Sequence, residues 1–347
     1  MSTPWERFKQ AARREQPEQV PVALIVDSPW LPGYAGIDTR DYFLFPDQWL
    51  KINKDLADRF PDIAWIPGFW VEYGMAAEPS AFGTKVRFHN DSPPSIEPII
   101  TDLNFWIDAA KPVNPQEDGF MPLILRMYEV MDQKLHAEGL GIHTVCARGP
   151  MTVASWLAGI PALMMELATN PDGVTRLLEV VTTSIISWLH AQLDTLHQPE
   201  GIMVLDDVVG MVSKRHYENL IHPHLRRIFD EFEGLIRVYH NDTVCPHLLG
   251  SLADANFDVF NFSHQIDIAD VKAQMGHRVA LLGNIPPLDV GVRGSPEDVK
   301  RCAQECLDKS AAGGGVILSF GGGVPPGVPA ENIDALQEAA RNWGKRS

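Results

Sequence analysis

Cysteine is scarce in this chain and is not spaced as disulfide frameworks or zinc ribbons require. The 347 residues contain four cysteines, and no two of them have the CxxC spacing. We therefore interpret all four as reduced thiols of a cytoplasmic protein. Cys302 and Cys306 lie four residues apart on an expected helix, a spacing that chance placement explains better than metal binding.

Long apolar runs and an excess of positive charge are also missing. No run of about 18 apolar residues occurs, so no membrane-spanning helix is predicted. The first nine residues, MSTPWERFK, are polar and amphipathic and do not match a secretory signal. Lysine and arginine number 29 against 45 acidic residues, which gives a net charge of −16. This acidity argues against nucleic acid or an anionic membrane as a main partner, and it suits a cytoplasmic enzyme.

The glycine motif of dinucleotide-binding sheets is absent, because no Gly-x-Gly-x-x-Gly follows the first expected strand. Short apolar runs instead alternate with helical stretches, a pattern that favours βαβ units with a parallel sheet buried on both faces. The expected strands are 21–26, 62–67, 141–147, 201–206, 235–240, 257–262, 279–283 and 315–320. The main expected helices are 47–59, 121–138, 150–168, 171–196, 214–233, 267–275, 296–311 and 329–344.

About eight such strands predict an α/β fold of the (β/α)₈ TIM-barrel type, in one domain covering residues 1–347. A helix at residues 3–15 is expected to precede the barrel. The stretch 68–120 is rich in proline, glycine and aromatic residues, so we expect long loops over the C-terminal rim, with short strands near 84–89.

Two strands end abruptly in polar residues, and in a β/α barrel the C-terminal strand ends carry the chemistry. One ends in His240, with Asp242 two residues later, and another ends in Asp206 and Asp207. We take Asp206, Asp207 and His240 as candidate catalytic residues. Adjacent residues of a strand point to opposite sides, so only one of the two aspartates can face the mouth. The other would cap the next helix or pair with an arginine.

His240 and Asp242 share one side of an extended strand and can together bind one Zn²⁺. A catalytic zinc normally has three protein ligands, and the third is not fixed by the sequence. We choose Glu72, and the alternatives are Asp207, His264 and Cys245. The competing interpretation has no metal, and Asp242 then fixes one tautomer of His240.

Aromatic residues crowd the first half of the chain, which suits an apolar pocket for a flat or methylated ligand, although ordinary core packing explains some of them, Trp65 included. The glycines at 321–323 permit close approach of backbone to a ligand, either to hold an anion or to clear space for a large substrate. The residues expected to contact substrate are Tyr34, Trp70, Trp156, His264, Asn284 and Gly322.

Seven segments are spread over nearly the whole chain: PVALIVDSPWLPGY at 21–34, FPDIAWIP at 60–67, RGPMT at 148–152, VSKRHYE at 212–218, GNIP at 283–286, GGGVILSFGGG at 313–323 and PAENI at 329–333. Taken together, they resemble the uroporphyrinogen decarboxylase superfamily. The resemblance implies a (β/α)₈ barrel, in agreement with the strand count.

The decarboxylase branch of that superfamily has features that this chain lacks. Its Arg-Gln-Ala-Gly-Arg run, which binds propionate groups, is replaced by Val-Asp-Ser-Pro-Trp at 26–30. The positions of its aspartate, tyrosine and late histidine fall on or near Phe69, Trp156 and Gly322. Because a substrate with several carboxylates needs fixed cations, the resemblance argues against porphyrinogen decarboxylation.

The other branch contains corrinoid-dependent methyltransferases, which bind zinc through His-x-Cys and a later cysteine. This chain has His240 in the histidine position, Asp242 in the first cysteine position and glycine near Gly322 in the second. A His/Asp site is harder than a thiolate site and suits an oxygen or nitrogen leaving group better than a thiol acceptor.

The resemblance thus implies a methyltransferase that moves a methyl group between a methoxy or N-methyl donor and cobalamin. No corrinoid-binding Asp-x-His-x-x-Gly segment occurs, so the corrinoid is expected on a partner protein. The alternatives are a lyase that decarboxylates another carboxylic acid and a binding protein without catalysis. The sequence leaves open the methyl donor, the metal and whether the chain forms a homodimer.

Overall fold

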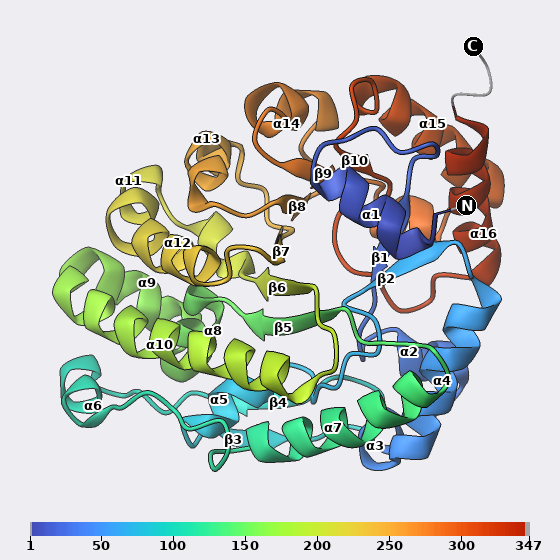
Figure 1. Ribbon diagram of the computed structural model, residues 1–347. Coiled ribbons are helices and arrows are strands. Elements are labelled where there is room, and N and C mark those ends of the chain that lie inside the picture. Colours follow the sequence, from blue (N-terminus) through green and yellow to red (C-terminus); the bar gives the residue numbers. More distant parts are fainter. Residues whose placement is uncertain (1, 344–347) are drawn as a thin grey trace.

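Eight parallel strands form the centre of the computed structural model, which describes residues 2–343 (Figure 1). Strands β5 to β10 pair in sequence order, β1 pairs with β2, and a bridge between Val22 and Leu318 joins the two sheets. The eight are β1 (Val22–Ile25), β2 (Ile63–Ile66), β5 (Thr144–Arg148), β6 (Gly201–Leu205), β7 (Ile236–Asn241), β8 (Val259–Phe262), β9 (Ala280–Leu282) and β10 (Val316–Ile317). The predicted (β/α)₈ barrel is therefore confirmed.

Helices lie outside the ring of strands (Figure 1). They are α1 (Pro4–Ala12), α2 (Leu31–Ala35), α3 (Thr39–Leu44), α4 (Pro46–Arg59), α5 (Ala77–Ala81), α6 (Leu103–Ala109), α7 (Met121–Ala137), α8 (Pro150–Ala158), α9 (Ile160–Thr169), α10 (Pro171–Thr195), α11 (Lys214–His216), α12 (His222–Glu231), α13 (Leu249–Leu252), α14 (Ile268–Met275), α15 (Pro296–Ser310) and α16 (Ala330–Asn342). The excursion after β2 also contains the antiparallel pair β3 (Lys85–Arg87) and β4 (Ser95–Glu97). Among residues 2–343 no single helix is long and apolar enough to cross a membrane, and only the sharply bent pair α8 and α9, taken together, reaches that length and apolarity.

Local chemistry explains where the helices begin and break. The Thr3 side chain accepts the Glu6 N–H while the Glu6 carboxylate accepts the Thr3 N–H, a capping box that starts α1. The helix expected over 150–168 is two helices, because the chain turns at Gly159 with a φ of +84°. The strand expected from 141 begins at Thr144. His143 therefore lies before β5, where its ring stacks on Trp5, and it is not an interior residue of the strand.

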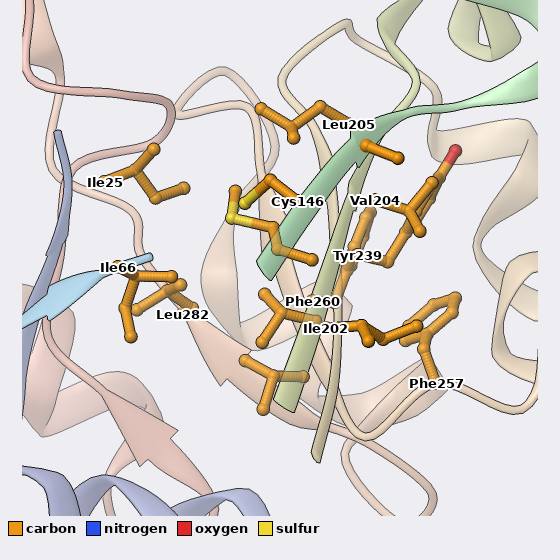
Figure 2. Packing of buried hydrophobic residues seen from close by; sticks show 14 of the residues in the cluster. Ile25, Ile66, Cys146, Ile202, Val204, Leu205, Tyr239, Phe257, Phe260 and Leu282 are labelled. Atoms are coloured by element: carbon orange, nitrogen blue, oxygen red, sulfur yellow. The ribbon is translucent and has the colours of Figure 1, made fainter. Parts of the chain in front are cut away.

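The strands are buried on both faces, as their continuous apolar runs predict. Their side chains belong to one large hydrophobic cluster. Figure 2 shows part of it, with labelled residues from β2, β5, β6, β7, β8 and β9 packed together, among them Ile66, Cys146, Leu205, Tyr239, Phe260 and Leu282. This core fixes the strand ends relative to one another.

The ring has one joint, between β2 and β5, at which no backbone hydrogen bond links neighbouring strands in the part of the chain that the structure describes. Side chains satisfy backbone groups there. Gln192 Nε2 donates to the Cys146 carbonyl at 3.0 Å, and Glu78 Oε1 accepts the Arg148 N–H at 2.7 Å. On the other side of the joint, the Tyr128 hydroxyl accepts the Val71 N–H at 3.3 Å. Side chains thus cover the edge of β5 and bind the loop that follows β2.

Candidate functional site

Three potential metal ligands gather where β6 and β7 end. Leu205 and His240 are partners in the parallel ladder, so Asp207, just after β6, lies beside His240 and Asp242. One ligand atom from each of the three residues lies within 4.8 Å of the other two. His240 Nε2 is 3.4 Å from Asp207 Oδ1, which also accepts the Asp242 N–H at 3.1 Å. We call Asp207, His240 and Asp242 the triad.

Asn261 on β8 fixes the tautomer of His240. Its Nδ2 donates to the carbonyls of Leu282 and Phe320, at 2.8 and 3.0 Å. The amide oxygen must then face His240 Nδ1, 2.7 Å away, and can only accept, so Nδ1 carries the proton. The lone pair is left on Nε2, toward Asp207. This is the arrangement that metal-binding histidines use.

Asp206 faces a different environment from its neighbour. It is completely buried, and its two carboxylate oxygens accept the N–H groups of Thr152, at 2.7 Å, and Met151, at 3.2 Å, in the first turn of α8. Burial raises the pKa of the Asp206 carboxyl to about 7, although the bonds from Thr152 and Met151 act in the opposite direction. A Cβ at Gly149 would lie 2.4 Å from this carboxylate, so the glycine makes room for it. The two aspartates thus have different partners, and Asp206 caps α8, which precedes β6, and not the next helix that the sequence suggested.

The glycine turn after β10 lies against the triad. Gly322 has a φ of +136°, and a Cβ there would lie 3.0 Å from Asp242 Oδ2. A Cβ at Gly321 would lie 2.5 Å from the backbone nitrogen of His264, so the turn also packs on the segment after β8. Burial and the charge of Asp207 raise the pKa of Asp242, while His240 and His264 lower it. Gly322 and His264, both predicted to contact substrate, are thus brought to the triad.

The predicted aromatic contacts do not form one cluster with these groups. Tyr34 is 39% exposed on α2 and stacks on Trp30, with ring centroids 4.5 Å apart. Trp70 is buried, and its ring lies 5.0 Å from the Arg148 guanidinium. Trp156 is half-buried on α8. Their contact with substrate remains a prediction.

Glu72 and Asn284 have other partners. Glu72 Oε1 accepts the Ser28 N–H at 2.7 Å, and Oε2 lies 3.6 Å from Arg148, so the structure does not bring Glu72 to the triad. Asp207, the alternative ligand, takes the third place. Asn284 is buried and donates through Nδ2 to the carbonyls of Ser263 and Ile266, which holds the segment after β8.

Sequence reasoning placed Asn261 at the rim without giving it a role, and it overlooked Asp27 and Arg148 as rim residues. Asp27 follows β1 just as Asp207 follows β6, a position that could have marked it. Arg148 is the last residue of β5, and its side chain is 12% exposed. Asn261 was visible as a polar residue in an apolar strand, but its effect on His240 depends on two carbonyls from distant segments.

The triad fits a divalent metal ion by its chemistry. Two carboxylates and one neutral imidazole are good donors for Zn²⁺, and three protein ligands leave a position for a substrate. The harder oxygen donors also suit Mn²⁺ or Fe²⁺. The buried amide behind the histidine orients the ring as such sites require.

Comparisons with known proteins agree with this architecture. The family described as "Uroporphyrinogen decarboxylase (URO-D)" matches residues 3–343. The chain is 25% identical to uroporphyrinogen decarboxylase from Synechococcus sp. (strain CC9605), over 96% of this chain and 95% of the relative. It is 26% identical to that from Xanthomonas oryzae pv. oryzae, over 98% and 99%. A solved methyltransferase from Methanosarcina mazei has the same fold, with a TM-score of 0.84, 21% identity and 98% of each chain covered. Since the family match spans almost the entire sequence, this chain belongs to the uroporphyrinogen decarboxylase family.

Proposed function

We propose that this protein is a methyltransferase that moves a methyl group from a small methoxy or N-methyl donor to cobalamin carried by a partner protein. The triad carries this proposal, because it presents three ligands and an oriented histidine at the C-terminal strand ends. The shared fold with the Methanosarcina mazei methyltransferase supports it. So does the absence of arginine at 26–30, where a porphyrinogen would need cations.

In this proposal the triad residues would hold Zn²⁺, His240 through Nε2 and the aspartates through carboxylate oxygens. The chemistry that the ion supplies is polarisation of the oxygen or nitrogen that bears the methyl group. That heteroatom keeps the electron pair of the broken bond as the methyl moves to the corrinoid, and it is then protonated. Asn261 keeps His240 in the ligand tautomer, and the Asp207 carboxylate, by accepting the Asp242 N–H, fixes how the two aspartates face each other.

Decarboxylation of another carboxylic acid is the alternative function. It needs a cation for the substrate carboxylate, and Arg148 is an arginine that the strand ends offer. Glu72 lies 3.6 Å from this guanidinium, and Glu78 accepts the Arg148 backbone N–H. The negative surroundings of Arg148 favour methyl transfer over this alternative.

The test combines metal analysis with single-turnover methyl transfer. The purified protein should bind about one Zn²⁺ per chain and should methylate cob(I)alamin in the presence of a methoxy or methylamine donor. The Asp207→Asn variant should bind less Zn²⁺ and methylate cob(I)alamin more slowly. The control variant Asp194→Asn, on the exposed side of α10, should leave Zn²⁺ binding and methyl transfer unchanged. Absence of metal together with turnover of a porphyrinogen or another carboxylic acid would establish the lyase instead.

A further inference from the structure

An apolar groove lies on the outside of the barrel, between α7 and the segment that contains α3 and the start of α4. Its cavity measures about 650 Å³, which is within the size range of small-molecule pockets. Figure 1 shows α3, α4 and α7 together at one side of the molecule. No triad residue lines the groove, which is therefore a separate site. Since α4 leads into β2 and α7 leads into β5, a ligand there would contact elements from both sides of the β2–β5 joint.

The two walls of the groove are apolar. Phe43, Tyr73 and Phe88 form the first wall, and their ring centroids lie 5.4–6.4 Å apart, so the rings support one another. The second wall is one face of α7, whose apolar residues each lie three or four positions from another: Leu123, Met127, Val130 and Met131. Leu44 and Leu123, which both line the groove, are 67% and 57% exposed. Contiguous apolar surface that stays in water is typical of a binding site.

The charge of the groove has the opposite sign to that of the chain. The whole chain has 45 acidic and 29 basic residues, which gives a net charge of −16. The charged residues that line the groove are one acid, Asp47, and three cations, Arg40, Arg126 and Lys134. A local excess of positive charge beside apolar walls favours a ligand that is both apolar and anionic.

Arg40 has the most distant acidic partner of the three cations. Its guanidinium lies 3.9 Å from the Asp38 carboxylate, which is beyond hydrogen-bond distance. The other two cations have carboxylate partners at 2.8 Å and 2.5 Å, from Asp47 and Glu129. All three cationic side chains are at least 46% exposed, so these ion pairs are weak and a ligand carboxylate can replace them. A guanidinium can bind a carboxylate through two parallel hydrogen bonds, which makes Arg40 the anchor for an anionic group.

We propose that this groove binds an apolar monocarboxylate, whose body lies between the aromatic wall and α7 and whose carboxylate pairs with Arg40. The three cations disfavour a cationic ligand. The apolar walls disfavour a small hydrated anion such as phosphate or acetate, which would lose its water without gaining apolar contacts. The inference needs neither the triad nor methyl transfer, so it stands apart from the proposed function. An amphipathic helix of a partner protein is the rival occupant, and the size of the cavity, which suits a small molecule, disfavours it.

Binding of single-chain amphiphiles to the full-length protein tests the groove. Calorimetric titration, below the aggregation concentration of each compound, would compare decanoate with 1-decanol and decyltrimethylammonium. We expect one decanoate per chain, bound at least about tenfold more tightly than decanol because its hydrogen bond to Arg40 is between charged groups. Decyltrimethylammonium should bind most weakly, and affinity should rise about fourfold for each methylene added between octanoate and decanoate. Equal affinity for the three head groups would overturn the proposal, as would no binding of any of these compounds.

Two variants with matched controls locate the bound ligand. Met127→Glu places a charge in the apolar wall and should weaken decanoate binding at least about tenfold, whereas Met165→Glu, at a 67% exposed position on α9, should not. Arg40→Gln should remove most of the preference for decanoate over decanol and leave decanol affinity unchanged, whereas Arg215→Gln, at an exposed position on α11, should keep the preference. Circular dichroism would confirm that each variant is folded. Wild-type decanoate affinity in folded Met127→Glu, or a wild-type preference between the head groups in Arg40→Gln, would refute the assignment.

Discussion

Replacing the neighbouring residues Asp206 and Asp207 one at a time by asparagine should affect two different properties of the protein. Asp206 accepts two N–H groups at the start of α8 in a fully buried position, whereas Asp207 lies 3.4 Å from His240 and is partly exposed. The first substitution should therefore affect the free energy of unfolding, and the second should affect metal binding.

The magnitudes follow from the contacts. In Asp206→Asn the amide oxygen can still accept one N–H, but the NH₂ group faces the other, so one buried hydrogen bond is lost, at about 1–3 kcal/mol. In Asp206→Ala both are lost, and the destabilisation should roughly double. Asp207→Asn removes a charged ligand. Loss of a residue that only orients a metal ligand lowers metal affinity roughly 10–100-fold. Loss of a direct ligand should cost at least as much, so Zn²⁺ affinity should fall by at least this factor.

Urea unfolding, followed by fluorescence of the nine tryptophans, measures the first effect. Competition with a chromophoric chelator measures the second. Asp194→Asn on the exposed side of α10 controls for loss of one negative charge. The assignment of roles would be wrong if Asp206→Asn abolished Zn²⁺ binding at unchanged stability, or if Asp207→Asn left Zn²⁺ affinity unaltered.

Three further changes probe other parts of the mouth. Asn261→Leu removes the acceptor that fixes His240, so Zn²⁺ affinity in the chelator assay should fall about 10–100-fold; an unchanged affinity would contradict the assigned tautomer. Gly322→Ala forces a side chain into a φ of +136° and to within 3.0 Å of Asp242, so urea unfolding should show a loss of about 1–3 kcal/mol, with weaker Zn²⁺ binding; wild-type values for both would show that the turn is not constrained. The pKa of Asp27 is raised from 3.8 to about 8, so its contribution to stability is lost as pH rises through that range. Asp27→Asn should therefore stabilise the ligand-free protein by roughly 2–4 kcal/mol more at about pH 8.5 than at about pH 5, after allowance for its remaining exposure; a pH-independent difference in thermal unfolding would refute this.

The barrel could be predicted from the sequence because the local composition of a segment indicates whether it forms a buried strand. Continuous apolar runs such as 22–26 and 201–205 specify buried parallel strands, and the polar residue after each run specifies the mouth. Helix breaks were harder to predict. Residues 150–169 are mostly apolar, so their periodicity does not show a break. The break is marked by Gly159, which has a positive φ, and by Pro161 in the first turn of α9.

The site was only partly predictable for a related reason. His240 and Asp242 are near in sequence, so their pairing follows from strand geometry alone. The third ligand depends on the register between β6 and β7, which brings Asp207 rather than Glu72 to the histidine. Likewise, which of Asp206 and Asp207 faces inward was left open by alternation, and the N–H groups of α8 decide it.

The joint between β2 and β5 has a mechanical consequence for the whole mouth. Elsewhere around the ring, moving one strand away from its neighbour breaks backbone hydrogen bonds, but here the contacts that span the joint are between side chains, such as that of Glu72, after β2, with Arg148, at the end of β5. The barrel can therefore open at this one joint. The β1–β2 pair bears Asp27, and the long sheet bears the triad. Separation of the two sheets at the joint changes the distance between these two sides of the mouth, while the backbone hydrogen bonds within each sheet stay intact.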